Sequence, residues 1–337
     1  MRYVARVGHR GVLLWAMSFA VACSANDLGN EAPGDAGNPG HSRDASASDA
    51  SSENVSVTKI TVGSFVFDAR VAGPASGEVV ILLHGFPETS YEWRHQMTAL
   101  SAAGYRVVAP DQRGYSPGAR PTSVDDYQVL QLAKDVADIA DALGVTRFHL
   151  VGHDWGAGVG WVVARLYPSR VITYTSASTP HPDALQQQLS DNSSCQHQAS
   201  SYFDTFVGPA AVGLFIDDDA GVLRSTYAGL SPEDVDVYVR ALGNRAAMTA
   251  ALDWYAANVG DGEFDTLALG AVTVPTLLVW GKDDQFFCKD TVELSRNFVQ
   301  APFTLVELDS VDHWVPENGA ERFNAALLEH LKKHASD

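Results

Sequence analysis

The chain has 337 residues, of which 41 are acidic and 23 basic, so its formal net charge is −18. This length allows one large or two small domains, and 46% hydrophobic residues are typical of a folded protein. The negative charge argues against nucleic acid as a partner, and three cysteines without a Cys/His cluster predict neither a disulfide scaffold nor a metal or cofactor.

The first 23 residues have the pattern of an export signal. Three arginines among the first ten residues precede a short apolar run over 11–22, which is too short to span a membrane comfortably. The run ends in Ala-Val-Ala-Cys23, which resembles a bacterial lipobox, with Ala where the first position is usually Leu. We therefore expect export from a bacterial cytoplasm and a lipid anchor on Cys23. A plain secretory signal cleaved near Ala22 or Ala25 is the alternative.

Residues 24–56 are rich in Ser, Asp, Ala, Gly, Asn and Pro and have almost no large apolar side chains. Such a segment cannot bury enough surface to offset the entropy cost of ordering it. The composition predicts a flexible acidic tether, which fits a protein anchored by a lipid. The folded part is expected to begin at residue 57.

From residue 57, segments of strand character alternate with segments of helix character. Apolar and polar residues alternate over 57–70, as in two short antiparallel strands. Further strands, read as buried and parallel, are expected at 78–83, 105–110, 147–151, 171–175, 273–280 and 303–308. Helices are expected at 93–103, 124–143, 157–167, 291–299 and 320–334.

This alternation predicts an α/β fold with a mostly parallel sheet flanked by helices. The core pattern pauses over residues 183–259, which are mostly helical and irregular. An insertion after the sixth strand would lie over the carboxyl ends of the strands as a cap, where open α/β sheets place their sites. The core is then expected in two parts, 57–182 and 260–337.

The stretch Gly152-His-Asp-Trp-Gly156 has the pattern of a nucleophile elbow. An apolar strand leads into it and helix-forming residues follow. The glycines let the backbone turn so sharply that the central side chain stands exposed on top of the sheet. Here that residue is Asp154, which is already ionised at neutral pH and can attack a saturated carbon without a base. By itself, the motif is equally consistent with a glycine-rich turn that carries an incidental Asp.

Two later strand ends supply possible partners for Asp154. Asp284 closes Trp280-Gly-Lys-Asp-Asp284, and His313 lies in Asp312-His-Trp314 after the last strand. The order nucleophile, acid, histidine matches that of α/β-hydrolases. Asp283 would be the acid if the strand ended one residue earlier.

Together these stretches resemble α/β-hydrolases of the soluble epoxide hydrolase and haloalkane dehalogenase branch, and the epoxide hydrolases most closely. The resemblance implies an α/β-hydrolase fold with a mostly parallel eight-stranded sheet and a helical cap after strand six. The family's spacing also favours Asp284 over Asp283. The matching stretches are His84-Gly-Phe-Pro-Glu88, Asp111-Gln-Arg-Gly-Tyr115, Gly152-His-Asp-Trp-Gly-Ala157, Pro180-His-Pro182, Trp280-Gly-Lys-Asp-Asp284 and Asp312-His-Trp314.

The resemblance also implies roles for individual residues. Asp154 would attack the substrate carbon to form an ester. His313, oriented by Asp284, would then act as general base on the water that hydrolyses this ester. Backbone N–H groups of Phe86 and Trp155 would form the oxyanion hole.

The leaving group separates epoxide from halide chemistry, because an alkoxide needs a proton donor and a halide does not. Epoxide hydrolases supply two tyrosines from the cap. Tyr255, in Leu-Asp-Trp-Tyr255, and Tyr202, in Tyr202-Phe-Asp-Thr-Phe, resemble the segments that carry them. The side chains of Trp155, Phe86 and Trp314 are expected to line the substrate pocket.

The leading hypothesis is an exported hydrolase that opens small-molecule epoxides to vicinal diols. A haloalkane or haloacid dehalogenase using Asp154 is one alternative, although Phe86 stands where many dehalogenases have Asn. A catalytically inactive surface binding protein is the other. Cys195 and Cys288 could pair in an oxidising compartment and clamp cap to core, or be two unrelated thiols.

Overall fold

The structure is a computed structural model that describes residues 55–335 apart from 228 and 261. The expected export signal with Cys23, and the tether up to residue 54, lie outside the described residues. The first strand begins at Ser56, one residue inside the expected tether. Every described helix is too short or too polar to cross a bilayer.

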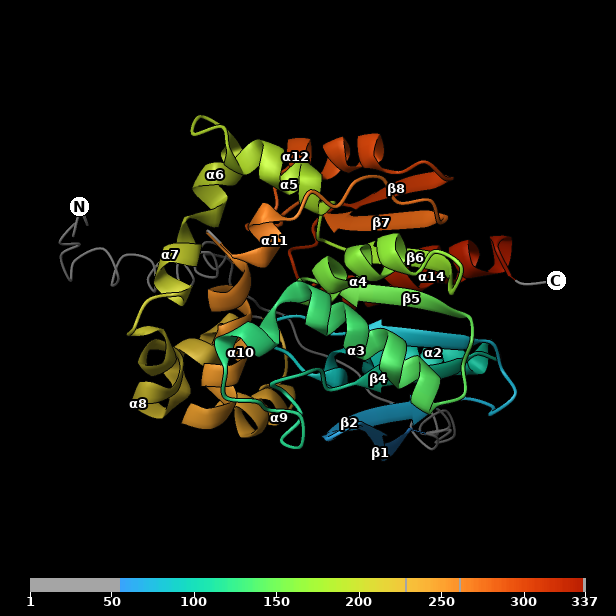
Figure 1. Ribbon diagram of the computed structural model, residues 1–337, viewed down its shortest axis with the longest axis horizontal. Coiled ribbons are helices and arrows are strands. Elements are labelled where there is room, and N and C mark those ends of the chain that lie inside the picture. The colour runs from blue at the N-terminus through green and yellow to red at the C-terminus, as the bar shows by residue number, and fades with distance from the viewer. Residues whose placement is uncertain (1–54, 228, 261, 336–337) are drawn as a thin grey trace, which may run out of the picture.

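The core is one eight-stranded sheet with the order β1-β2-β4-β3-β5-β6-β7-β8 (Figure 1). Only β2 pairs antiparallel, with β1 and β4, and the other neighbours run parallel. This confirms the expected mostly parallel sheet. The strands are β1 Ser56–Val62, β2 Phe65–Ala72, β3 Val79–Leu83, β4 Arg106–Pro110, β5 Phe148–His153, β6 Val171–Ala177, β7 Thr276–Gly281 and β8 Phe303–Leu308.

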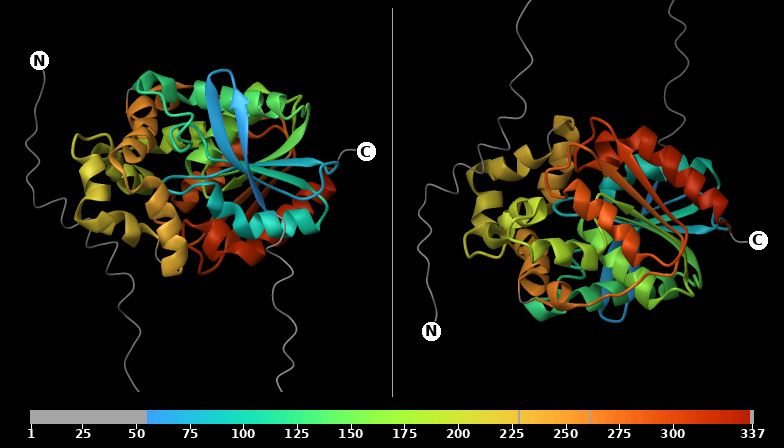
Figure 2. Two further views of the ribbon diagram at one scale, coloured as in Figure 1. Left: turned by 90° about the horizontal axis from the view of Figure 1, so that it is seen from below. Right: turned by 90° about the horizontal axis from the view of Figure 1, so that it is seen from above.

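Helices cover both faces of the sheet, and for this reason every residue of β3 and β5 is buried. α2 (Arg94–Ala102) and α14 (Ala320–Lys333) pack on one face, and α3 (Val129–Ala142) and α4 (Trp155–Leu166) on the other (Figures 1 and 2). Shorter core helices are η1 Ser90–Trp93, η2 Val124–Tyr127, α12 Lys289–Leu294, η4 Ser295–Phe298 and α13 Val315–Asn318.

The helix expected over 124–143 is interrupted. Residues of η2 form a short 3-10 turn, Gln128 is extended at φ −60° and ψ 142°, and α3 begins at Val129. The buried side chain of Asn258 accepts a hydrogen bond from Val129 N at 2.8 Å. This long-range contact satisfies a backbone donor at the start of α3, which explains why the helix can begin there.

Between β6 and β7 the chain is mainly helical, and residues 182–266 are named here the helical insertion. In Figure 1, α6 to α10 lie together at one end of the sheet. The helical character continues past the expected limit at residue 259. The helices are α5 Pro182–Leu189, α6 Cys195–Ala199, η3 Ser200–Tyr202, α7 Phe203–Phe206, α8 Ala211–Thr226, α9 Pro232–Leu242, α10 Arg245–Asn258 and α11 Glu263–Thr266.

The turn between β5 and α4 is as sharp as the glycine pattern predicts. Asp154 has φ 48° and ψ −122°, a strained conformation for a residue with a side chain. A Cβ on Gly156 would lie 2.1 Å from the carbonyl oxygen of Leu83, and one on Gly152 would lie 2.4 Å from that of Gly156. Glycine is required at both positions because backbone passes where a side chain would begin.

Gly156→Ala is expected to lower the free energy of unfolding by about 3 kcal/mol or more, because the clash is with backbone that cannot move aside. Urea denaturation followed by circular dichroism measures this. Gly158→Ala is the matched control on the same helix, since its Cβ would meet only ring atoms, of Phe264 at 3.4 Å and of Trp155 at 4.0 Å. Equal stability of the two variants would contradict the packing argument.

Candidate active site

Three titratable side chains meet at the carboxyl edge of the sheet. Asp154 follows β5, Asp284 follows β7, and His313 follows β8. Nδ1 of His313 lies 3.0 Å from Oδ2 of Asp284, and its Nε2 lies 3.5 Å from Oδ2 of Asp154. The imidazole therefore stands between two carboxylates. The partner of His313 is Asp284, whose side chain is fully buried, and not the exposed Asp283.

The carboxylate of Asp154 is held by a backbone donor from the loop after β3. Phe86 N donates to Oδ1 of Asp154 at 2.8 Å. The peptide bond from Phe86 to Pro87 is cis. Gly85 allows the loop to approach, since a Cβ there would lie 2.5 Å from that of Asp154. The second expected oxyanion donor, Trp155 N, begins α4, and its role stays a prediction.

The charges of Asp154 and His313 stabilise each other. Burial alone would raise the pKa of Asp154, but the hydrogen bond and charge of His313 outweigh it and hold this pKa below its usual value. Burial alone would lower the pKa of His313, but the charge of Asp284 and the contact with Asp154 raise it to about 9. In the resting protein at neutral pH, a cationic imidazole therefore lies between two anions.

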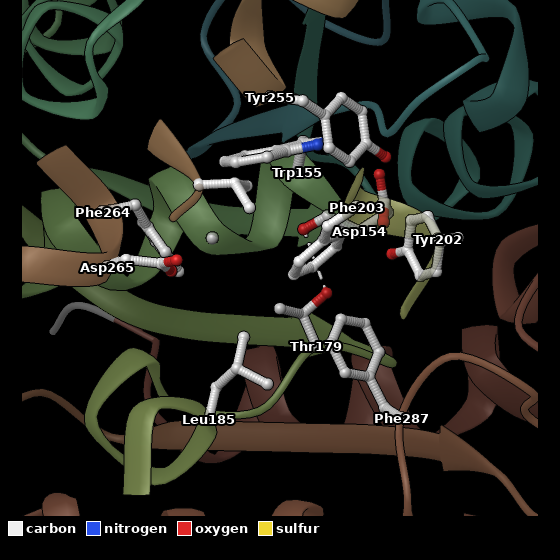
Figure 3. Close-up of a pocket in the computed structure, with 12 residues that line it drawn as sticks. Asp154, Trp155, Thr179, Leu185, Tyr202, Phe203, Tyr255, Phe264, Asp265 and Phe287 are labelled. Carbon is white, nitrogen blue, oxygen red and sulfur yellow. Dashed lines mark hydrogen bonds between the residues drawn. The ribbon is translucent and has the colours of Figure 1, made fainter. Parts of the chain in front are cut away.

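Two tyrosines of the helical insertion face this carboxylate. The hydroxyls of Tyr202 and Tyr255 point toward Asp154 (Figure 3), and their ring centroids are 6.4 Å apart. Burial raises the pKa of both phenols well above 10, and the negative charge of Asp154 raises them further. Both phenols therefore keep their protons at neutral pH and are available as donors.

A cavity opens beside these groups (Figure 3). Of the three side chains expected to line it, Trp155 is among the lining residues, and a place for Phe86 and Trp314 in the substrate pocket stays a prediction. The ring of Phe86 packs against Phe215 and Tyr255 of the insertion, and that of Trp314 packs against both His313 and His153. The residues that line the cavity are Asp154, Trp155, Gly158, Thr179, Leu185, Tyr202, Phe203, Tyr255, Val259, Phe264, Asp265 and Phe287.

Comparison with known proteins agrees with this geometry. The family described as alpha/beta hydrolase fold matches residues 78–320. The chain is 31% identical over 281 residues to human "Epoxide hydrolase 4", covering 79% of this chain and 76% of that protein. It is 30% identical over 299 residues to "Epoxide hydrolase A" of Mycobacterium tuberculosis, covering 77% and 92%.

A solved structure described as "Novel epoxide hydrolases belonging to the alpha/beta hydrolases superfamily in metagenomes from hot environments" is also similar. It superimposes with a TM-score of 0.73 at 31% identity and covers 82% of this chain and 98% of that one. The chain belongs to the alpha/beta hydrolase fold family. Its nucleophile position, acid and histidine follow the strands in the order typical of this family.

In this α/β-hydrolase a second buried group lies behind the elbow, and the sequence motifs did not reveal it. Nδ1 of His153 lies 3.2 Å from Oε2 of Glu88 and 3.1 Å from Oε1 of Glu92. Burial, followed by the charge of Glu92, raises the pKa of Glu88 to about 8. Burial alone would lower the pKa of His153, but Glu92 and Glu88 raise it well above its usual value. His153 is therefore a cation that balances buried carboxylate charge.

Among the described residues, Glu88, Glu92 and His153 form the group whose side chains could hold a metal ion, because their ligand atoms all lie within 4.8 Å of one another. A proton on His153 supplies positive charge there instead. The expected absence of a metal stays a prediction.

Asp284→Asn should lower the pKa of His313 by about one pH unit or more, because it removes an anion that stabilises the imidazolium. In the wild type the ring should stay protonated until the pH approaches about 9. Nuclear magnetic resonance of the ring nitrogens across a pH titration measures both values. Asp283→Asn, at the exposed neighbour, is the matched control and should leave the titration unchanged; an equal shift in both variants would contradict the assignment.

Proposed function

We propose that this α/β-hydrolase opens epoxides to vicinal diols through an ester between Asp154 and the substrate. The observation that carries the proposal is the convergence of two protonated phenols on a buried, ionised carboxylate in a mostly apolar cavity. Relatives and similar structures described as epoxide hydrolases support it. Small-molecule epoxides with apolar substituents are the substrates that this cavity favours.

In the first step a carboxylate oxygen of Asp154 attacks a ring carbon of the epoxide, and the bond from that carbon to the ring oxygen breaks. Tyr202 or Tyr255 donates its proton to the departing oxygen and becomes a phenolate. A phenol with a raised pKa is a strong base once ionised, so the phenolate recovers a proton from the imidazolium of His313. This transfer leaves His313 neutral.

Ester formation itself favours this change. The ester carries no charge, so one of the two anions that raise the pKa of His313 is gone. Neutral His313 then takes a proton from a water that attacks the carboxyl carbon of Asp154. The negative charge of the tetrahedral intermediate falls on the oxygen that Phe86 N contacts. Collapse expels the diol, which takes the proton from His313, and the acid proton of Asp154 returns to His313.

The dehalogenase alternative uses the same carboxylate but a different leaving group. A halide leaves without a proton and needs only weak donors around the ion. An alkoxide needs a proton as it leaves, and two buried phenols that face Asp154 can donate one. A halide gains no acid catalysis from them. The tyrosines therefore favour the epoxide. A purely binding role would not need the contact of His313 with both Asp154 and Asp284.

We also propose that the protein works in an oxidising compartment after export. A disulfide joins Cys195 to Cys288, and disulfides persist outside the reducing cytoplasm. The lipid anchor on Cys23 stays a prediction, since that residue lies outside the described part of the chain.

A single turnover in water labelled with heavy oxygen tests the nucleophile. With enzyme in excess over styrene oxide, the diol of the first turnover should contain unlabelled oxygen from Asp154, because water attacks the carboxyl carbon. Mass spectrometry of the diol detects this. Asp154→Ala should form no ester and no diol, and full label in the first-turnover diol would sink the proposed route.

Tyr255→Phe and Tyr202→Phe should each lower kcat for epoxides by about tenfold to a hundredfold, because each removes a proton donor in the ring-opening step. The double variant should lose nearly all activity. Tyr127→Phe is the control, since its hydroxyl donates to the carbonyl oxygen of Pro121 and does not line the cavity. Release of bromide from a bromoalkane at a rate that survives the double variant would instead favour the dehalogenase.

A further inference from the structure

The segment that follows β7 is tied to the helical insertion by a covalent bond. The disulfide connects Cys195, the first residue of α6, to Cys288, which precedes α12, over 93 residues of sequence. Cys288 lies only four positions after Asp284. The bond therefore joins the insertion to the loop that carries the acid, and residues 284–288 are named here the acid loop.

The neighbouring residue Gln196 reinforces this connection. Its fully buried side-chain amide donates from Nε2 to the carbonyl oxygen of Phe286 at 2.8 Å and accepts from Cys288 N at 3.0 Å. The same Nε2 also donates to Oγ of Ser200 at 2.9 Å. Ser200 begins η3, which ends at Tyr202. One amide thus contacts both the acid loop and the short helix that carries a tyrosine of the site.

The acid loop in turn holds Asp284. The backbone N–H groups of Phe286 and Phe287 donate to Oδ1 of Asp284 at 2.7 and 3.1 Å. Oδ2 is left to face His313. The ring of Phe286 has its centroid 4.7 Å from that of His313 and 5.3 Å from that of Tyr202. The acid loop therefore carries Asp284 and packs against both His313 and Tyr202.

The two tyrosines of the site differ in what holds them. Tyr255 lies on α10, a helix of 14 residues. Tyr202 lies on η3, which has three residues, after α6, which has five. Helices this short have little stability of their own, so the place of Tyr202 depends on contacts with the rest of the protein. Gln196 and the disulfide are such contacts.

We propose that the Cys195–Cys288 disulfide and Gln196 form a clamp that sets the position of Tyr202 relative to the Asp284–His313 pair. Gln196 is then a positioning residue for both chemical steps, since ring opening uses Tyr202 and ester hydrolysis uses His313. The inference rests on the proposed function for those two roles. Loss of the clamp removes none of the reacting groups, but it lets the distances between them vary. Catalysis is then slowed more than substrate binding is weakened.

Four preparations isolate the clamp. Gln196→Met keeps the volume of the side chain but removes its hydrogen bonds, and Gln196→Glu keeps only the ability to accept. The double variant Cys195→Ser with Cys288→Ser removes the covalent bond, and a phosphine reductant does so in the unaltered protein. Ser231→Ala is the control, since it removes the N-terminal cap of α9, elsewhere in the insertion.

Rapid-quench mass spectrometry with excess enzyme and styrene oxide separates the steps, because the ester raises the protein mass by that of the epoxide. Gln196→Met and the serine double variant should slow both formation and hydrolysis of the ester by about tenfold, with little change in KM. The reductant should slow the wild type and leave the serine double variant as it is. Ser231→Ala should keep both rates. Unchanged rates in folded clamp variants would overturn the clamp and leave the proposed function standing.

A double-mutant cycle shows whether the effect acts through Tyr202. If it does, Gln196→Met should slow ester formation far less in a Tyr202→Phe background than in the wild type. A Tyr255→Phe background should preserve the effect. Additive losses with Tyr202→Phe would mean that Gln196 acts on stability alone and would overturn the positioning role.

One readout does not depend on turnover. The proton on Nδ1 of His313, shared with Asp284, should give a downfield proton resonance that Asp284→Asn abolishes. Gln196→Met should move this resonance, and Ser231→Ala should not. If the wild type formed no ester with any epoxide, the proposed function would fail, while the clamp would still stand or fall on whether this resonance moves.

Discussion

The buried carboxylate of Asp154 is the group on which the rest of the site depends. An anion in such a place is costly unless it is paired, and here it contacts the imidazole of His313 and the N–H of Phe86. Its backbone is also strained, with φ 48°. The crossing of β5 and α4 at two glycines, and the close approach of the β3 loop at Gly85, hold this strain in place.

Two imidazoles bring positive charge close to the carboxylate of Asp154. His313 contacts it, and His153 lies beside His313, with its Nε2 2.9 Å from the carbonyl oxygen of His313. Both imidazoles keep a proton because buried carboxylates stand beside them. The charge of His153, like that of His313, lowers the pKa of Asp154.

The helical insertion contributes side chains to the site. It supplies both phenols and most of the apolar lining, and it supports the core loops around Asp154. Tyr227 donates to the carbonyl oxygen of Pro87, and Gln196 holds the loop that follows Asp284. Because Asp154 follows a strand of the sheet while the two phenols lie on the insertion, these contacts fix the two parts of the site relative to each other.

The sequence by itself determined the strand-helix alternation and the elbow at Asp154, because each is marked by a short local pattern. It also predicted His313 from the order of the strand ends, and Asp284, Tyr202 and Tyr255 from the resemblance of the stretches around them to epoxide hydrolases. Tertiary structure alone decided that Cys195 and Cys288 pair, which way the rings of Phe86 and Trp314 turn, and that Glu88 and Glu92 meet His153. It also set the break before α3, where Asn258 caps Val129 from 129 residues away. The reason is physical: side-chain direction and burial follow from packing between distant segments, and no local spacing encodes that packing.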